Sequence, residues 1–215
     1  MYFTLLGLPA AGKGTQAKKI SQVYDLTHIS TGDIFRRLIE EETAFGIKAK
    51  KYIDQGKLVP DQDTIQILKE NLQQVNLERG CVLDGFPRTL KQAESLTVIL
   101  AEMGLKLDMV FYLQVDKEVL VHRLSGRRVC PNCGATYHLE YNPPQVKGSC
   151  DRCEHHLIQR ADDKPDTLQR RLQASSDEMD KLVDYYQKQG ILVAIPSEKI
   201  EMVFTRIKQA IEVRM

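Results

Sequence analysis

The sequence has no excess of charge of either sign. Its 30 lysines and arginines stand against 29 aspartates and glutamates, which leaves a formal net charge of +1. Proteins that bind nucleic acid or membrane surfaces by bulk attraction carry a basic excess. The balance therefore argues against both kinds of partner, and any recognition of phosphate groups must come from locally placed arginines and lysines.

Long apolar runs are also missing. No stretch approaches the roughly 18 apolar residues of a membrane-spanning helix, and no basic segment precedes the short apolar run near the N-terminus. We expect neither a membrane anchor nor a signal peptide, which makes the cytoplasm the expected compartment. Internal repeats and low-complexity tracts are absent as well. The 215 residues suit one domain of ordinary size with insertions.

What the sequence does contain is a glycine-rich segment at residues 7–15, GLPAAGKGT, between an apolar run of strand type and a helical segment. This order is typical of a phosphate-binding P-loop, whereas an accidental turn would not place strand, loop and helix together. Small residues let backbone N–H groups approach a polyphosphate, and the helix N-terminus adds partial positive charge. Gly14 stands where Ser or Thr usually follows the lysine, a shift typical of one branch of nucleotide kinases. The residues predicted to cradle the phosphates are Gly7, Ala10, Ala11, Gly12, Lys13, Gly14 and Thr15.

Strand and helix patterns alternate through the rest of the chain, which predicts a mostly parallel sheet. The strand at residues 81–83 ends in Asp84, where P-loop proteins place a carboxylate on the Mg²⁺ side. Gly85 and Pro87 make a turn at the carboxyl edge of the sheet, so Arg88 should face the same crevice as Lys13. The segment at residues 30–37, STGDIFRR, reads from its residues alone as a capped helix with solvated arginines.

Two C-x-x-C pairs, Cys130/Cys133 and Cys150/Cys153, are separated by 16 residues. This spacing is typical of a zinc ribbon, in which four thiolates complete a tetrahedral shell. Four incidental thiols are improbable, and redox disulfides do not suit a cytoplasmic chain. With four cysteines available, the nearby histidines are expected on the surface. They are His138, His155 and His156.

Together these motifs carry a resemblance. The chain is similar to bacterial-type adenylate kinases of the long form with a four-cysteine zinc lid, over essentially all 215 residues. The matching motifs are GLPAAGKGTQ at 7–16, STGDIFR at 30–36, GKLVPD at 56–61, DGFPRT at 84–89, GRR at 126–128, the four cysteines and RADD at 160–163. The resemblance implies an α/β P-loop nucleoside monophosphate kinase fold with a five-stranded parallel core of residues 1–29, 60–126 and 164–215. It also implies an AMP-binding insertion at 30–59 and a zinc-bearing lid at 127–163.

The resemblance further implies a role for each matching residue. The implied catalytic cations are Lys13, Arg88, Arg127, Arg160 and Arg171. The implied ATP contacts outside the P-loop are Arg123, Arg127, Thr136, Tyr137 and Lys199. The implied AMP contacts are Thr31, Arg36, Lys57, Leu58, Val59, Gly85, Phe86, Pro87, Arg88, Gln92, Arg160 and Arg171. Asp33 and Asp84 resemble the carboxylates that orient hydrated Mg²⁺.

Two departures from the family pattern bear on these roles. Ala10 stands where the family loop often has glycine, so the turn must accommodate a Cβ. Pro196 and Ser197 occupy a site that is often Asp-Gly, which weakens the expectation of a backbone contact from Lys199 to ATP.

The expected activity is reversible phosphoryl transfer from MgATP to AMP by a monomer with a structural Zn²⁺. The sequence contains no plausible nucleophile–base pair, which fits an acceptor that is already an anion. Two alternatives stay open. One is a kinase for UMP or CMP, because base choice depends on few contacts; the other is a zinc-ribbon nucleic-acid-binding protein with a P-loop, against which the near-neutral charge argues.

Overall fold

The computed structural model of the protein describes residues 1–163, 165–196 and 199–214, without the side chains of residues 165 and 166. Its elements follow one another as β1 (Tyr2–Leu6), α1 (Lys13–Tyr24), β2 (Thr27–Ser30), α2 (Thr31–Glu40), α3 (Ala44–Ile53), α4 (Asp61–Gln74), β3 (Cys81–Asp84), α5 (Leu90–Glu102), β4 (Met109–Gln114), α6 (Lys117–Ser125), β5 (Arg127–Val129), β6 (Thr136–His138), a short 3₁₀ helix (Ala161–Asp163), α7 (Pro165–Lys188), β7 (Leu192–Pro196) and α8 (Ile200–Arg214). The sequence predicts most of these elements to within one to three residues.

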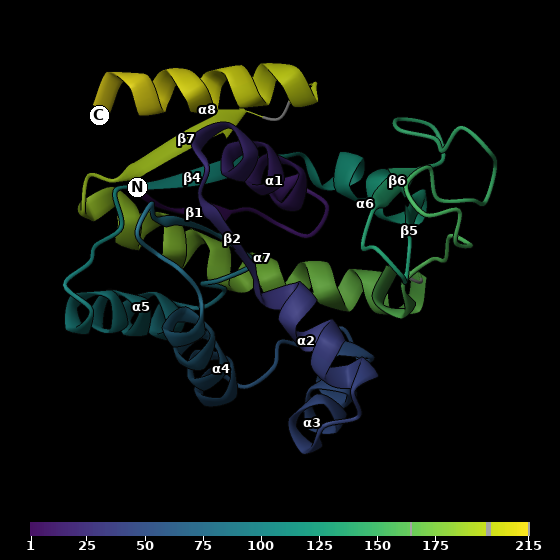
Figure 1. The fold of residues 1–215 in the computed structure, drawn as a ribbon, viewed down its shortest axis with the longest axis horizontal. Helices are drawn as coiled ribbons and strands as arrows, with labels where there is room; N and C mark the ends of the chain where they lie inside the picture. Colours follow the sequence, from purple (N-terminus) through teal and green to yellow (C-terminus); the bar gives the residue numbers. More distant parts are fainter. Residues whose placement is uncertain (164, 197–198, 215) are drawn as a thin grey trace.

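Five strands form one parallel sheet in the order β2-β3-β1-β4-β7, as Figure 1 shows. Helices connect them because parallel neighbours need crossover connections. Helices α1 and α8 cover one face of the sheet, and α4, α5 and α7 cover the other (Figure 1). The predicted five-stranded parallel sheet is thus confirmed.

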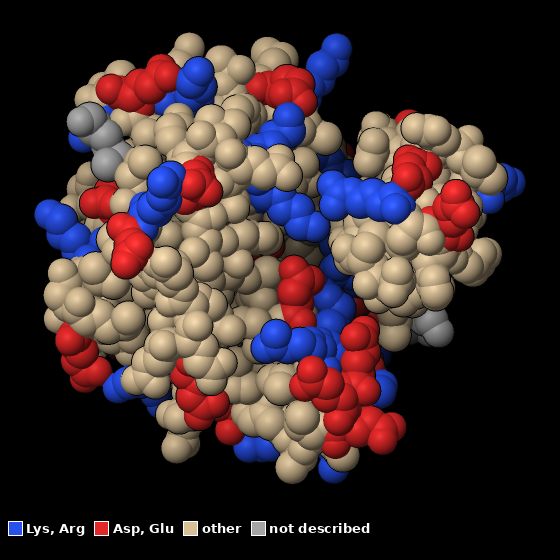
Figure 2. Space-filling view, viewed as in Figure 1, with Lys and Arg blue, Asp and Glu red and all other residues tan. Residues whose placement is uncertain are grey.

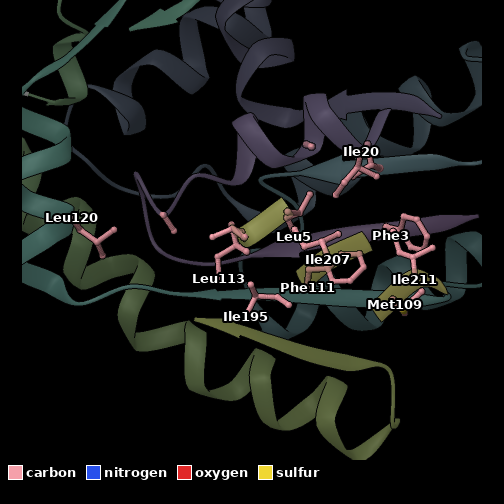
Figure 3. Packing of buried hydrophobic residues seen from close by; sticks show 14 of the residues in the cluster. Phe3, Leu5, Ile20, Met109, Phe111, Leu113, Leu120, Ile195, Ile207 and Ile211 are labelled. Atoms are coloured by element: carbon pink, nitrogen blue, oxygen red, sulfur yellow. The ribbon is translucent and has the colours of Figure 1, made fainter. Parts of the chain in front are cut away.

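The main core lies between the sheet and the α1–α8 layer. Phe3 and Phe111, from the adjacent strands β1 and β4, meet edge to face with their ring centroids 5.5 Å apart. Figure 3 shows these rings beside aliphatic side chains of α1 and α8, among them Ile20, Ile207 and Ile211. The fully or nearly fully buried members of this layer include Leu5, Ile20, Met109, Leu113, Leu120, Ile195, Ile207 and Ile211. This packing fixes the carboxyl ends of the strands relative to one another.

Two smaller units project from this core (Figure 1). The helical insertion, α2 and α3, has its own cluster around Phe35, Ala49 and Val59. The cysteine lobe, residues 127–163, contains the two-stranded antiparallel sheet β5–β6. Gly126 ends α6, and Arg127 and Arg128 begin the strand β5. Within the described residues no helix is long and apolar enough to cross a membrane.

Gly46 allows the two helices of the insertion to approach at backbone distance. A Cβ built on it would collide with the Leu38 carbonyl group and lie 2.7 Å from the Ile39 nitrogen. In an open helix Gly→Ala gains up to about 1 kcal/mol of stability through helix propensity. Here the overlap is with backbone that cannot rotate away.

We predict that Gly46→Ala lowers the free energy of unfolding by about 1–3 kcal/mol, because overpacking displaces α3 from α2. Urea denaturation followed by circular dichroism measures the change. A variant as stable as the wild type, or more stable, would show that propensity dominates and that the helices are not held in this contact.

Candidate active site

The P-loop lies between the end of β1 and the start of α1. Gly12 caps the helix with φ 99°, and Ala10 adopts φ 63°. The P-loop therefore accepts alanine at position 10, although this residue takes a left-handed backbone conformation that costs about 1–2 kcal/mol. The ammonium group of Lys13 donates to the carbonyl oxygens of Gly7 (2.7 Å) and Leu8 (3.0 Å). The loop thus holds its lysine at the centre of the predicted phosphate cradle.

Lys13 shares a small cavity of about 50 Å³ with two predicted arginines. Arg88, after β3, and Arg171, on α7, line it together with Gly7 and Gly85. Removal from water lowers the pKa of Lys13 to about 7; Asp84 opposes this shift, while Arg88, Arg171 and Arg127 add to it. Burial likewise lowers the pKa of Arg88 to about 10. The cavity therefore concentrates positive charge, which a polyphosphate would stabilise.

Asp84 faces the P-loop from the end of β3. A Cβ built on Gly14 would lie 3.1 Å from its Oδ2 atom, so the glycine keeps the space before this carboxylate open. His28 on β2 approaches the same oxygen at 3.8 Å. A carboxylate beside open space next to the phosphate cradle fits the outer coordination of a hydrated Mg²⁺. Asp33 is mostly exposed and pairs with Arg36.

The strongest ion pairs of the site belong to Asp163. Its fully buried carboxylate accepts two hydrogen bonds from Arg127, with Nε at 2.7 Å from Oδ2, and one from Arg171 at 2.8 Å. Arg171 also pairs with Asp162 at 2.8 Å. The forked pair of bonds from Arg127 fixes the plane of its guanidinium group. The two aspartates of the RADD motif thus supply the negative charge that these buried arginines require.

Arg160 is the least compensated cation of the group. Its Nε atom is buried and has no hydrogen-bond partner among the described residues. Burial, followed by the charges of Arg127 and Arg36, lowers its pKa to about 9. Figure 2 shows basic side chains along the hollow between the main body and the cysteine lobe. An unpaired buried donor in such a hollow is suited to an anionic ligand.

The residues predicted to bind AMP gather where β3 meets the insertion. Thr31 is buried, and its hydroxyl donates to the Gly85 carbonyl at 2.9 Å. Arg88 Nε donates to the same carbonyl at 2.8 Å. Phe86 and Pro87 are buried, while Lys57 is exposed, Leu58 partly exposed and Val59 buried.

Gln92 is 1% exposed, and both ends of its amide are engaged. Its Oε1 accepts from the Arg88 backbone N–H at 2.8 Å, and its Nε2 donates to Asp61 at 2.7 Å. In this structure the residue therefore also anchors the turn that carries Arg88, a role that its sequence position does not indicate.

A second cavity, of about 380 Å³, opens at the carboxyl ends of β4 and β7. Arg123 lines it with Gln114, Val119 and Pro196. Its size is within the range of small-molecule sites, and its position matches the predicted adenine side of ATP. Lys199 is exposed just beyond β7, and Ser197 lies outside the described residues.

The three histidines of the cysteine lobe match the sequence prediction only in part. His138, expected on the surface, is 9% exposed, because its ring packs between α6 and the turn that follows β6; that prediction is wrong. His155 and His156 are exposed, as expected.

Tyr137 is buried in the lobe core, where its hydroxyl accepts from the Asp151 N–H at 2.9 Å and lies 3.5 Å from Cys150 Sγ. Thr136 is exposed and leaves its side chain available.

The four cysteines form the predicted cluster. Their Sγ atoms all lie within 4.8 Å of one another, with Cys130–Cys153 at 3.4 Å and Cys133–Cys150 at 3.5 Å. A disulfide needs about 2.05 Å, whereas sulfurs about 2.3 Å from one tetrahedral metal lie about 3.8 Å apart. The thiols therefore fit Zn²⁺, with all four positions of its shell filled by protein.

A P-loop on a parallel sheet, facing a group of convergent arginines, defines a P-loop nucleotide phosphotransferase. Comparison with known proteins agrees. The adenylate kinase family model matches residues 5–191. The chain is 53% identical over 213 residues to the adenylate kinase of Limosilactobacillus reuteri, covering 98% of each chain. It is 50% identical over 210 residues to that of a Geobacillus species, covering 97% of each, and 50% over 212 residues to that of Clostridioides difficile, covering 98% of each. The chain belongs to the adenylate kinase family.

The closed sulfur shell predicts a structural metal. The lobe has a core of only a few side chains, so metal binding supplies much of its folding energy. We expect one zinc per chain by elemental analysis. Stripping it with a thiol reagent and chelator should lower the melting temperature, while activity well below that temperature should largely survive. Loss of turnover with the lobe still resistant to protease would instead indicate a catalytic metal.

The lowered pKa of Lys13 predicts proton uptake on nucleotide binding. Above about pH 7 this lysine is largely neutral in the free protein, and phosphate charge favours its protonated form. Between about pH 7 and pH 9, ATP affinity should fall as pH rises, by up to about tenfold per unit. Calorimetry at about pH 8 in two buffers of different ionisation enthalpy measures the uptake. Equal uptake by the wild type and Lys13→Met would contradict the assignment.

Proposed function

We propose that the protein catalyses MgATP + AMP ⇌ MgADP + ADP, with the transferred phosphoryl group between Lys13 and Arg88. The observation that carries this reaction is the convergence of cations from separate segments on one small cavity. Lys13 comes from the P-loop, Arg88 from the turn after β3, and Arg171 from α7. Arg127 and Arg160 come from the ends of the cysteine lobe.

The chemistry that we assign to these residues is positioning and charge stabilisation. The AMP phosphate is already a nucleophile, so no general base is needed. Guanidinium groups keep their charge near neutrality and bind phosphate oxygens through two parallel N–H donors. Holding donor and acceptor phosphates in line inside a group of fixed donors lowers the barrier without covalent catalysis.

On this proposal ATP enters along the P-loop with its adenine in the cavity beside Arg123. AMP lies between the helical insertion and the turn that carries Arg88, with Thr31, Val59 and Gln92 near its base. Mg²⁺, when bound with ATP, would supply positive charge to its phosphates. Asp84 and Asp33 are proposed to hold the waters of that ion.

The cysteine lobe, residues 127–163, is proposed as a lid over ATP, and residues 30–59 as the AMP-binding unit. Water competes with AMP as acceptor, so a lid that closes over both substrates limits hydrolysis. Arg127 is carried by the first lobe strand and Arg160 by the last lobe segment. Closure therefore moves both cations together. We further propose that the protein acts as a monomer in the cytoplasm.

The experiment that tests this function is an ADP-forming assay with ATP and each of four nucleoside monophosphates. AMP should be preferred over UMP, CMP and GMP in kcat/KM. A preference for UMP or CMP would transfer the same chemistry to another acceptor. Binding of nucleic acid at low salt without any turnover would support the remaining alternative and refute the kinase proposal.

Arg88→Lys tests the role given to this arginine. Lysine keeps a positive charge but loses the two parallel N–H donors of the guanidinium group and the hydrogen bond from Nε to the Gly85 carbonyl oxygen. We predict a fall in kcat of about a hundredfold or more, because the phosphate is no longer held in line, with the melting temperature nearly unchanged. Steady-state kinetics with AMP measures it. Near-wild-type kcat would remove Arg88 from the phosphoryl transfer site.

A further inference from the structure

His138 joins the cysteine lobe to the core. It is the last residue of β6, and its register partner on β5 is Arg127. Next to it, the Leu139 N–H donates to the carbonyl oxygen of Gly126 at 3.0 Å. Gly126 ends α6 in the core and immediately precedes Arg127. The imidazole therefore lies at the point where the chain leaves the core and begins the lobe.

The hydrogen bonds of this imidazole define its protonation state. Nδ1 accepts from the backbone N–H groups of Glu140 and Tyr141, both at 3.1 Å. Nε2 lies 3.4 Å from the His122 carbonyl oxygen on α6 and so acts as a donor. Only the neutral ring with its proton on Nε2 satisfies all these groups at once. The ring also stacks on Tyr141, with centroids 4.5 Å apart.

The ring occupies space that only a glycine leaves open. A Cβ built on Gly126 would collide with Nε2 and lie 2.5 Å from Cε1 of His138. Gly126 has φ −86°, which any residue can adopt. The glycine is therefore required by the close approach of the imidazole and not by its own backbone conformation.

Arg127 depends on this contact for its direction. Its guanidinium group, held by Asp163, must reach the phosphates from a strand of only three residues. On one side that strand is paired with β6, whose end His138 ties to α6. A shift of β6 against α6 would turn β5 and move the guanidinium group with it.

We propose that neutral His138 is a positioning residue, which sets the direction of β5 and thereby the placement of Arg127 for phosphoryl transfer. The inference rests on the proposed function only for the role of Arg127. On the proposed function Arg127 contacts the phosphates, and His138 acts through it.

Protonation at Nδ1 turns the acceptor into a donor and leaves the N–H groups of Glu140 and Tyr141 unpaired. The titratable groups around the ring are few. His122 faces it from α6 with ring centroids 5.9 Å apart, and the Glu140 carboxylate pairs with His122 at 2.8 Å. Tyr141 faces it from the turn, and Arg127 follows on β5 with its charge held by Asp163. The contact therefore requires the neutral ring.

Three variants separate the contributions of the ring. His138→Phe keeps an aromatic ring without an acceptor, and it should lower kcat by about tenfold to a hundredfold through misplacement of Arg127. KM for AMP should change little, because the AMP side lies elsewhere. His138→Asn keeps an oxygen near the Nδ1 position that cannot be protonated, so it should restore most of kcat. His156→Phe, the same change at an exposed lobe histidine, is the control and should behave as wild type.

Amide hydrogen exchange supplies a readout that does not depend on activity. The Glu140 and Tyr141 amides should exchange faster in His138→Phe and remain protected in His138→Asn. Faster exchange with unchanged kcat would overturn the proposal. If the wild type itself made no ADP while the exchange pattern held, the proposed function would fail and the structural role of His138 would stand.

A double-mutant cycle tests whether His138 acts through Arg127. In an Arg127→Ala background, His138→Phe should cause no further loss of kcat, because the positioned group is gone. Losses that multiply would overturn the proposal, and they would also identify a general collapse of the lobe. Gly126→Ala gives an independent route to the same displacement. It should lower kcat in the wild type but far less in His138→Asn, which lacks the ring atoms that collide; equal losses in both backgrounds would contradict the packing argument.

Discussion

The structure depends on one buried carboxylate. Asp163 is completely enclosed and binds Arg127 and Arg171, which reach it from the cysteine lobe and from α7. Burial, and after it the charges of neighbouring arginines, lowers the pKa values of Lys13, Arg88 and Arg160, so the charged forms of these groups need an anion near this point. Removing one partner of a buried ion pair costs about 3–5 kcal/mol. Asp163 therefore keeps a cationic site folded while no nucleotide is bound.

The sheet explains why these cations can converge at all. In a parallel sheet the loops after the strands emerge at one edge, so the P-loop after β1 and the turn after β3 become neighbours although 70 residues separate Gly14 from Asp84. The core around Phe3 and Phe111 fixes those strand ends (Figure 3). The helical insertion, the cysteine lobe and α7 add the remaining arginines from outside the sheet.

The sequence predicts those features of the site that depend on residues close together in the chain. The P-loop, Asp84 at the end of a strand, the four cysteines and the alternating elements each depend on a few consecutive residues or a fixed spacing. The pairing of Asp163 with two arginines, the buried amide of Gln92 and the inward ring of His138 depend on distant partners. No periodicity distinguishes a buried histidine that packs over Gly126 from an exposed one. Tyr137 likewise faces the cysteines because the lobe folds around them.

The most direct test of this account is the stability of Asp163→Asn with and without nucleotide. Asn keeps the shape but removes the charge, and Asp162→Asn, at a less buried carboxylate, is the matched control. Melting is followed without ligand and with a non-hydrolysable ATP analogue plus AMP. If Asp163 provides the negative charge that phosphates later supply, its replacement lowers the melting temperature sharply in the free protein and much less in the complex. An equal loss in both states would show that the carboxylate is only a structural anchor and would contradict the account.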